Sequence, residues 1–202
     1  MSDPITLAVE GTTDAAVARR LLDEAGLQPG PEYVRRGKGP LDRKLAGYNN
    51  AARFSCWLVL RDLDQDAACA PALSERLLPN PAVHMRLHIA VHAVEAWLLA
   101  DAESISRSLS ISQARVPADP EAIPHPKRAL VDLARQSRKR SVREALVPAQ
   151  GTTAKVGPGY AVFLIEFASY HWRPEVAATR SPSLARLRMF LREISQRGGD
   201  TC

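Results

Sequence analysis

The sequence predicts an α/β fold, in which a mostly parallel sheet is flanked by helices and followed by a helical carboxyl-terminal extension. Short apolar runs typical of buried strands alternate with amphipathic helical patterns in the first half of the chain. No convincing strand pattern follows Ser104. We therefore expect an α/β domain over residues 1–103 and a helical extension over residues 104–202, packed on it as a separate unit or within one continuous domain.

The first half begins with a buried strand over residues 5–9. Thr12, Thr13 and Asp14 are N-cap candidates for the helix that follows, and Gly26 is placed to end it. The next predicted elements are a weak strand over 31–36, a helix over about 41–53, a strand over 56–60, a helix over 66–78 and a half-exposed strand over 83–89.

The second half reads as helices joined by a long loop. Val94, Trp97 and Leu98 form a helical apolar stripe, which places Glu95 on a different face. A segment rich in proline and serine over residues 109–126 predicts the loop. Further helices are expected near residues 126–138, 158–169 and 182–195.

Three acidic residues follow the two most apolar predicted strands. Glu10 comes directly after the first, and Asp62 and Asp64 come after the strand over residues 56–60. Alternation along an extended chain would point both aspartates the same way, about 7 Å apart. Ligands collect beyond the carboxyl ends of parallel strands, and hard cations such as Mg²⁺ or Mn²⁺ take carboxylate ligands. The pattern therefore predicts a divalent metal site.

These residues resemble a known family. The turn Glu10-Gly11-Thr12-Thr13-Asp14 and the pair Asp62-Leu63-Asp64 are similar to the two signature motifs of the Toprim domain of topoisomerases, bacterial primases, RecR-type proteins and OLD-family nucleases. Residues 89–101, IAVHAVEAWLLAD, are similar to a segment of the DUF4276 family of small bacterial Toprim-like proteins. Residues 157–160, GPGY, and 181–186, SPSLAR, resemble that family's later landmarks, so the resemblance covers nearly the whole chain.

The resemblance implies a Toprim-like, metal-dependent nuclease fold. It also implies a partner ATPase of the ABC or OLD type and a role in antiphage defence. Glu95, within the longer matched segment, would be a further metal ligand or a carboxylate beside the ligands. An alternative zinc site of His88, His92 and Glu95 is disfavoured, because His88 belongs to an alternating strand and shares no helical face with the other two.

Charge is distributed unevenly along the chain. Residues 1–103 hold 11 basic and 14 acidic side chains, a net charge of −3, whereas residues 104–202 hold 16 and 8, a net charge of +8. A basic surface beside an acidic metal site suits a phosphodiester substrate. The candidate phosphate contacts are Lys38 between two glycines, Lys155 in a flexible stretch, and the cluster Arg138, Lys139 and Arg140. Each of them could equally be a solvated surface residue.

The sequence-based hypothesis is a metal-dependent nuclease. Glu10, Asp62 and Asp64 would hold one or two Mg²⁺ or Mn²⁺ ions, Glu10 could also move a proton, and Lys155 or Lys38 would neutralise transition-state charge. The alternative is a noncatalytic Toprim scaffold that binds nucleic acid or an ATPase. Phosphotransfer through a nucleophilic Asp62 is disfavoured by Gln65, where such phosphatases carry Thr or Val.

A cytoplasmic protein without membrane attachment is expected, because the start of the chain is polar and no apolar run approaches the length of a membrane span. The sequence leaves the oligomeric state and the choice between DNA and RNA open.

Overall fold

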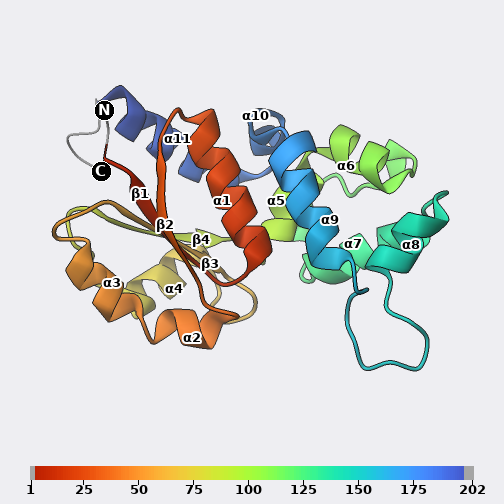
Figure 1. Cartoon of the computed structure of the whole chain (residues 1–202), viewed down its shortest axis with the longest axis horizontal. Helices are drawn as coiled ribbons and strands as arrows, with labels where there is room; N and C mark the ends of the chain where they lie inside the picture. Colours follow the sequence, from red (N-terminus) through yellow and green to blue (C-terminus); the bar gives the residue numbers. More distant parts are fainter. Residues whose placement is uncertain (1–2, 198–202) are drawn as a thin grey trace.

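A four-stranded, all-parallel sheet forms the centre of the molecule (Figure 1), in a computed structural model that describes residues 3–197 of the 202. The strand order is β2-β1-β3-β4. The strands are β1 (Ile5–Val9), β2 (Pro29–Val34), β3 (Trp57–Asp62) and β4 (Met85–Ala90). The predicted α/β class, with a parallel sheet flanked by helices and a helical carboxyl-terminal part, is confirmed.

The two central strands, β1 and β3, are buried along their whole lengths. Helices cover them on both faces, which is why their sequences are almost continuously apolar instead of alternating. Val9 of β1 lies opposite Leu60 of β3. The residues that follow these two positions therefore reach the same edge of the sheet.

Three helices between β2 and β4 cover one face of the sheet, and the helix after β1 together with α11 (Pro182–Gln196) covers the other (Figure 1). The helices on the first face are α2 (Lys38–Asp42), α3 (Leu45–Ala51) and α4 (Ala70–Leu77), and those on the second are α1 (Thr12–Glu24) and α11. Along β1 and β3, successive side chains point to opposite faces of the sheet and so enter two different buried clusters. Ala8 and Val59 pack with Leu41 of α2. Leu7 and Leu58 belong to the cluster that contains Leu191 of α11.

Two local predictions are wrong. The helix expected over residues 41–53 is two short helices, α2 and α3, and α2 already begins at Lys38, because proline is tolerated in the first turn of a helix. The N-cap of α1 is Gly11, with no side-chain hydrogen bond, and not one of the polar residues that follow it. Asp14 is thereby left for another contact.

The remaining helices lie beyond the carboxyl ends of the strands, at the right of Figure 1. They are α5 (Val94–Ala100), α6 (Ala102–Leu109), α7 (Pro126–Arg135), α8 (Arg140–Leu146), α9 (Tyr160–Glu166), a π-helix η3 (Phe167–His171), α10 (Pro174–Ala177), and the 3₁₀ turns η1 (Gln113–Arg115), η2 (Pro120–Ala122) and η4 (Ala178–Arg180). Within residues 3–197, no strand follows β4, as predicted, and no helix is long and apolar enough to cross a membrane.

The last helix fixes the second half of the chain to the sheet. Trp97 Nε1 donates a 2.7 Å hydrogen bond to Ser183 Oγ, and His88 Nε2 lies 3.0 Å from the Ser183 carbonyl. Arg188 forms an ion pair with Glu24 of α1. One buried hydrophobic cluster runs from Ile5 to Ile194, so it draws on both predicted parts of the chain.

Candidate functional site

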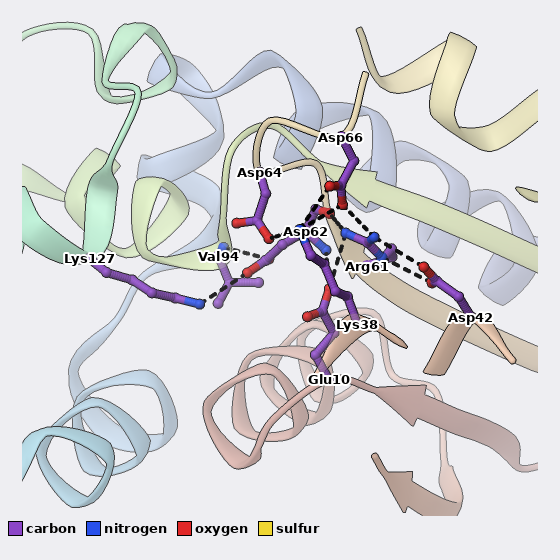
Figure 2. Close-up of polar contacts among 9 residues, drawn as sticks. All are labelled: Glu10, Lys38, Asp42, Arg61, Asp62, Asp64, Asp66, Val94 and Lys127. Atoms are coloured by element: carbon purple, nitrogen blue, oxygen red, sulfur yellow. Dashed lines mark hydrogen bonds and ion pairs between the residues drawn. The ribbon is translucent and has the colours of Figure 1, made fainter. Parts of the chain in front are cut away.

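Carboxylates gather where β1 and β3 end (Figure 2). Glu10 follows β1, and its Oε1 accepts a 3.0 Å hydrogen bond from the backbone N–H of Asp62, the last residue of β3. Asp62 is buried, and its Oδ1 accepts a 3.1 Å bond from the backbone N–H of Val94 at the start of α5. The predicted proximity of Glu10 and Asp62 follows from the parallel pairing of their strands.

Two further buried acids, Asp14 of α1 and Glu95 of α5, interact electrostatically with Asp62. The hydroxyl of Tyr160, at the start of α9, donates a 3.2 Å hydrogen bond to Glu95 Oε1. Glu95 Oε2 is buried and has no hydrogen-bond partner among residues 3–197. We call Glu10, Asp14, Asp62 and Glu95 the carboxylate cluster.

Burial is the main cause of unusual proton affinities in the carboxylate cluster. It raises the pKa of Asp14 to about 7, with a further increase from the Glu95 charge. It also raises the pKa of Glu95 to about 7, against the opposing effect of Lys127. For Asp62, burial and then the Asp14 charge raise the pKa well above its usual range. Adjacent buried carboxylates have raised pKa values because each disfavours the charged form of the others, and a bound cation would favour the charged forms and lower those pKa values.

Lys127, in the first turn of α7, supplies a positive charge to the cluster. Its Nζ lies 3.4 Å from Asp62 Oδ2, and 55% of its side chain stays exposed. Partial burial lowers its pKa, but Glu95, Asp62 and Asp14 outweigh that effect and raise the pKa above its ordinary value. The ammonium group is therefore charged at neutral pH, and it lies between solvent and the buried acids.

Asp64 is held by different partners from Asp62. Strand β3 ends at Asp62, and Asp64 adopts a left-handed backbone with φ +48°, so alternation along a strand does not orient it as predicted. Its Oδ2 lies 3.2 Å from Lys38 Nζ, which also contacts Asp66 at 2.8 Å (Figure 2). Lys38, predicted to contact phosphate, is engaged with these acids in the structure.

Arg61 supports the cluster from inside the sheet. Its side chain is only 2% exposed, and it donates two hydrogen bonds of 3.1 Å to Asp42 and one of 2.6 Å to Asp66 (Figure 2). Its Nη1 also lies 3.5 Å from Glu10 Oε1 and bonds the Asp62 carbonyl. Arg61 therefore connects Glu10 to the loop that carries Asp64 and Asp66.

A cleft of about 730 Å³ opens beside the carboxylate cluster. Residues of α7 line one wall, Pro148 and residues 154–156 of the segment over 148–156 line another, and Asp64 and His92 complete the lining. The basic residues that line it are His92, His125, Lys127, Arg128, Arg135 and Lys155. Lys155 lines this cleft, and its predicted role at phosphate stays a prediction. Arg138 and Lys139, which precede α8, and Arg140, its first residue, are exposed and do not line this cleft.

The predicted ligation of a metal by Glu10, Asp62, Asp64 and Glu95 stays a prediction. As their side chains lie, residues 3–197 contain no group of three or more His, Cys, Asp or Glu placed to hold an ion. Direct hydrogen bonds to backbone N–H groups and lysines occupy oxygens of Glu10, Asp62 and Asp64. The zinc alternative has no support, because His88 is buried against Ser183.

Comparisons of the chain with protein-family models, curated proteins and solved structures found no match.

The structure adds residues that the sequence analysis did not select for the site. Asp14 was predicted as a cap candidate and as part of the Toprim-like turn, but not as a site residue; it lies in the first turn of α1, close in sequence to Glu10. Arg61 directly follows the predicted strand over residues 56–60 and was not selected, whereas the observed strand β3 includes it. Lys127 and Tyr160 each lie 65 residues from their carboxylate partners, and no local pattern signals such contacts.

Proposed function

We propose that this protein is a Toprim-like, divalent-metal-dependent phosphodiesterase that acts on nucleic acid. The observation that carries the proposal is the joining of two features: the carboxylate cluster at the strand ends and the basic cleft that opens beside it. Lys127 belongs to both, because it lines the cleft and contacts Asp62. Metal-dependent phosphodiester cleavage uses acidic side chains that hold the metal and basic side chains that hold the phosphate.

The chemistry of the carboxylate cluster fits Mg²⁺ or Mn²⁺. Both ions prefer oxygen ligands, and Glu95 presents a buried oxygen without a hydrogen-bond partner among the described residues. Burying an unpaired ionised carboxylate is costly, and a cation removes that cost. We expect Glu10, Asp62 and Glu95 to hold the ion, together with Asp14 and with Asp64 after it leaves Lys38.

A bound divalent ion would lower the pKa of a water molecule and stabilise the leaving oxygen. The protein's own groups perform the other tasks. Lys127 and Lys155 neutralise phosphate charge from the cleft. Tyr160 keeps Glu95 in position through its hydroxyl.

The proposal is tested by cleavage assays with purified protein. Labelled linear DNA, supercoiled plasmid and RNA are incubated with Mg²⁺, with Mn²⁺ and with a chelator. We expect metal-dependent cleavage that falls at least about a hundredfold in Asp62→Asn and Asp14→Asn. The matched control is Asp23→Asn, also on α1, where the side chain is 78% exposed and only pairs with Arg20.

Cleavage that persists in Asp62→Asn at the wild-type rate would rule out the carboxylate cluster as the reaction centre. Binding of nucleic acid without cleavage in any metal would favour the noncatalytic scaffold instead. The ATPase partner and the role in antiphage defence rest on the sequence resemblance alone. Repeating the assay with an ABC or OLD-type ATPase encoded beside this gene tests that part of the proposal.

A further inference from the structure

We propose that the cleft between α7 and residues 148–156 accepts an unpaired strand of nucleic acid, so that single strands and frayed ends are the substrates and intact duplex is not. The inference takes its ligand class, nucleic acid, from the proposed function. It adds the strandedness of the substrate and the surface that selects it.

Positive charge lines both walls of the cleft. Lys127, Arg128 and Arg135 lie along α7, and Lys155 lies on the facing segment. All four side chains belong to exposed residues. Asp132 is shared by the two arginines, 3.8 Å from Arg128 and 3.5 Å from Arg135, so it offsets part of their charge. Basic groups on two facing walls suit one backbone that passes between them.

The cleft is not lined by charge alone. Apolar groups occupy a large part of its surface, namely Ala93, Pro124, Pro126, Val131, Pro148, Ala154 and Val156. Two imidazoles, His92 and His125, lie among them, and His92 Nδ1 is buried without a hydrogen-bond partner in the part of the chain that the structure describes. A phosphate does not use apolar surface, whereas an unstacked base does, and imidazole rings can stack on bases.

The shape of the cleft separates single strands from duplex. Its volume of about 730 Å³ is that of a pocket for a small organic ligand, and it is concave. Proteins that read duplex DNA instead project a helix or strand into a groove. In a duplex, bases are stacked and paired inside the helix, so their faces cannot reach His92, Pro124 or Ala154. A single strand can present both its phosphates and its bases to this surface.

The geometry also relates the cleft to the carboxylate cluster. Asp64 and Lys127 line the cleft, and Lys127 reaches Asp62. A strand lying along α7 would therefore bring a backbone phosphate to Lys127 while the neighbouring bases contact the apolar wall. Residues along α7 would select single-stranded over duplex nucleic acid, and the carboxylate cluster would hold the ion that supports its cleavage.

The test is equilibrium binding measured by fluorescence anisotropy in chelator, where no metal-dependent cleavage occurs. The probes are labelled oligothymidylate, an oligouridylate of the same length, and a blunt-ended DNA duplex. We expect the single strands to bind at least about tenfold more tightly than the duplex. The double variant Arg128→Ala, Lys155→Ala should weaken single-strand binding about tenfold and reduce the salt dependence of log K by about 1 to 2.

The matched control is Arg138→Ala, Arg140→Ala, which removes the same charge from exposed positions outside the cleft. Wild-type binding in this control supports the inference. Duplex binding as tight as single-strand binding overturns it, as does equal weakening by the two double variants. The cleavage assay separates this inference from the proposed function: a metal-dependent nuclease that prefers duplex refutes only the inference, and cleft-dependent single-strand binding without cleavage refutes only the hydrolysis.

Discussion

Replacing Arg61 by methionine tests whether the buried guanidinium stabilises the loop beside the carboxylate cluster. The substitution keeps an unbranched side chain as far as the Nε position and removes the charged guanidinium carbon and its two terminal nitrogens. It leaves Asp42 and Asp66 without three hydrogen bonds of 2.6 to 3.1 Å and leaves Glu10 without a cation 3.5 Å away. Removing one partner of a buried charge pair costs about 3 to 5 kcal/mol.

The structure places Arg61→Met at the lower end of that range. The side chains of Asp42 and Asp66 are each 25% exposed, so water can replace part of what Arg61 supplied. Glu10, 12% exposed, keeps its bond from the Asp62 N–H. We expect a loss of about 3 kcal/mol in the free energy of unfolding, which corresponds to a fall in Tm of about 6 to 12 °C for a chain of this size.

The assay is urea unfolding followed by circular dichroism, with Arg107→Met as the control. Arg107 forms an ion pair with Glu103 on the surface and is 74% exposed, so its loss should change the unfolding free energy by less than about 0.5 kcal/mol. Arg61→Lys keeps the positive charge but loses the forked guanidinium donors, so its free energy of unfolding should lie between those of wild type and Arg61→Met. An Arg61→Met loss below about 1 kcal/mol, with an unchanged m-value, would refute the reasoning.

Two further predictions concern the fold. Burial, and then the charge of Arg86, lower the pKa of His88 to about 3 from 6.5, so the folded protein keeps this imidazole neutral while the unfolded chain protonates. His88 alone therefore contributes a loss of stability as the pH decreases from about 6.5 toward 4, whereas Asp14 and Glu95, whose pKa values are raised to about 7, contribute a gain over the same range. We expect the unfolding free energy of wild type minus that of His88→Gln, measured by urea unfolding, to decrease as the pH falls through this range. At Gly157 an added Cβ would lie 2.4 Å from the Ala145 carbonyl oxygen, so Gly157→Ala should cost about 1 to 3 kcal/mol, measured as a lower thermal midpoint. Gly47→Ala is the matched control: the added methyl on α3 meets no atom within 4 Å, and it should be neutral or stabilising by up to about 1 kcal/mol.

Much of the sheet could be predicted from the sequence, because buried parallel strands require runs of apolar residues. Residues 5–9 and the core of β3 are such runs. The edge strand β2 was harder, since its exposed residues and two prolines hide the pattern. The start of α2 at Lys38 was missed for a related reason: Gly39 and Pro40, residue types that usually break a helix, here lie in its first turn.

The candidate site was predictable only where its residues follow strands. Glu10 and Asp62 meet because parallel strands end at one edge of a sheet. The orientation of Asp64 depends on a left-handed backbone angle, which aspartate adopts more readily than most residues but which its sequence context does not specify. Lys127 and Tyr160 reach the site through the packing of α7 and α9, and only the three-dimensional fold supplies that information.

The attachment of α11 sets an order for folding during synthesis on the ribosome. The contact of His88 with the Ser183 carbonyl joins residues that are 95 positions apart in the chain. The ion pair of Glu24 with Arg188 joins residues that are 164 positions apart. Contacts of such high sequence separation form late, and until then one face of the nascent sheet lacks its last covering helix. A ribosome stalled before residue 181 would therefore present exposed apolar strands, and we expect chaperones to engage this chain until its final helix emerges.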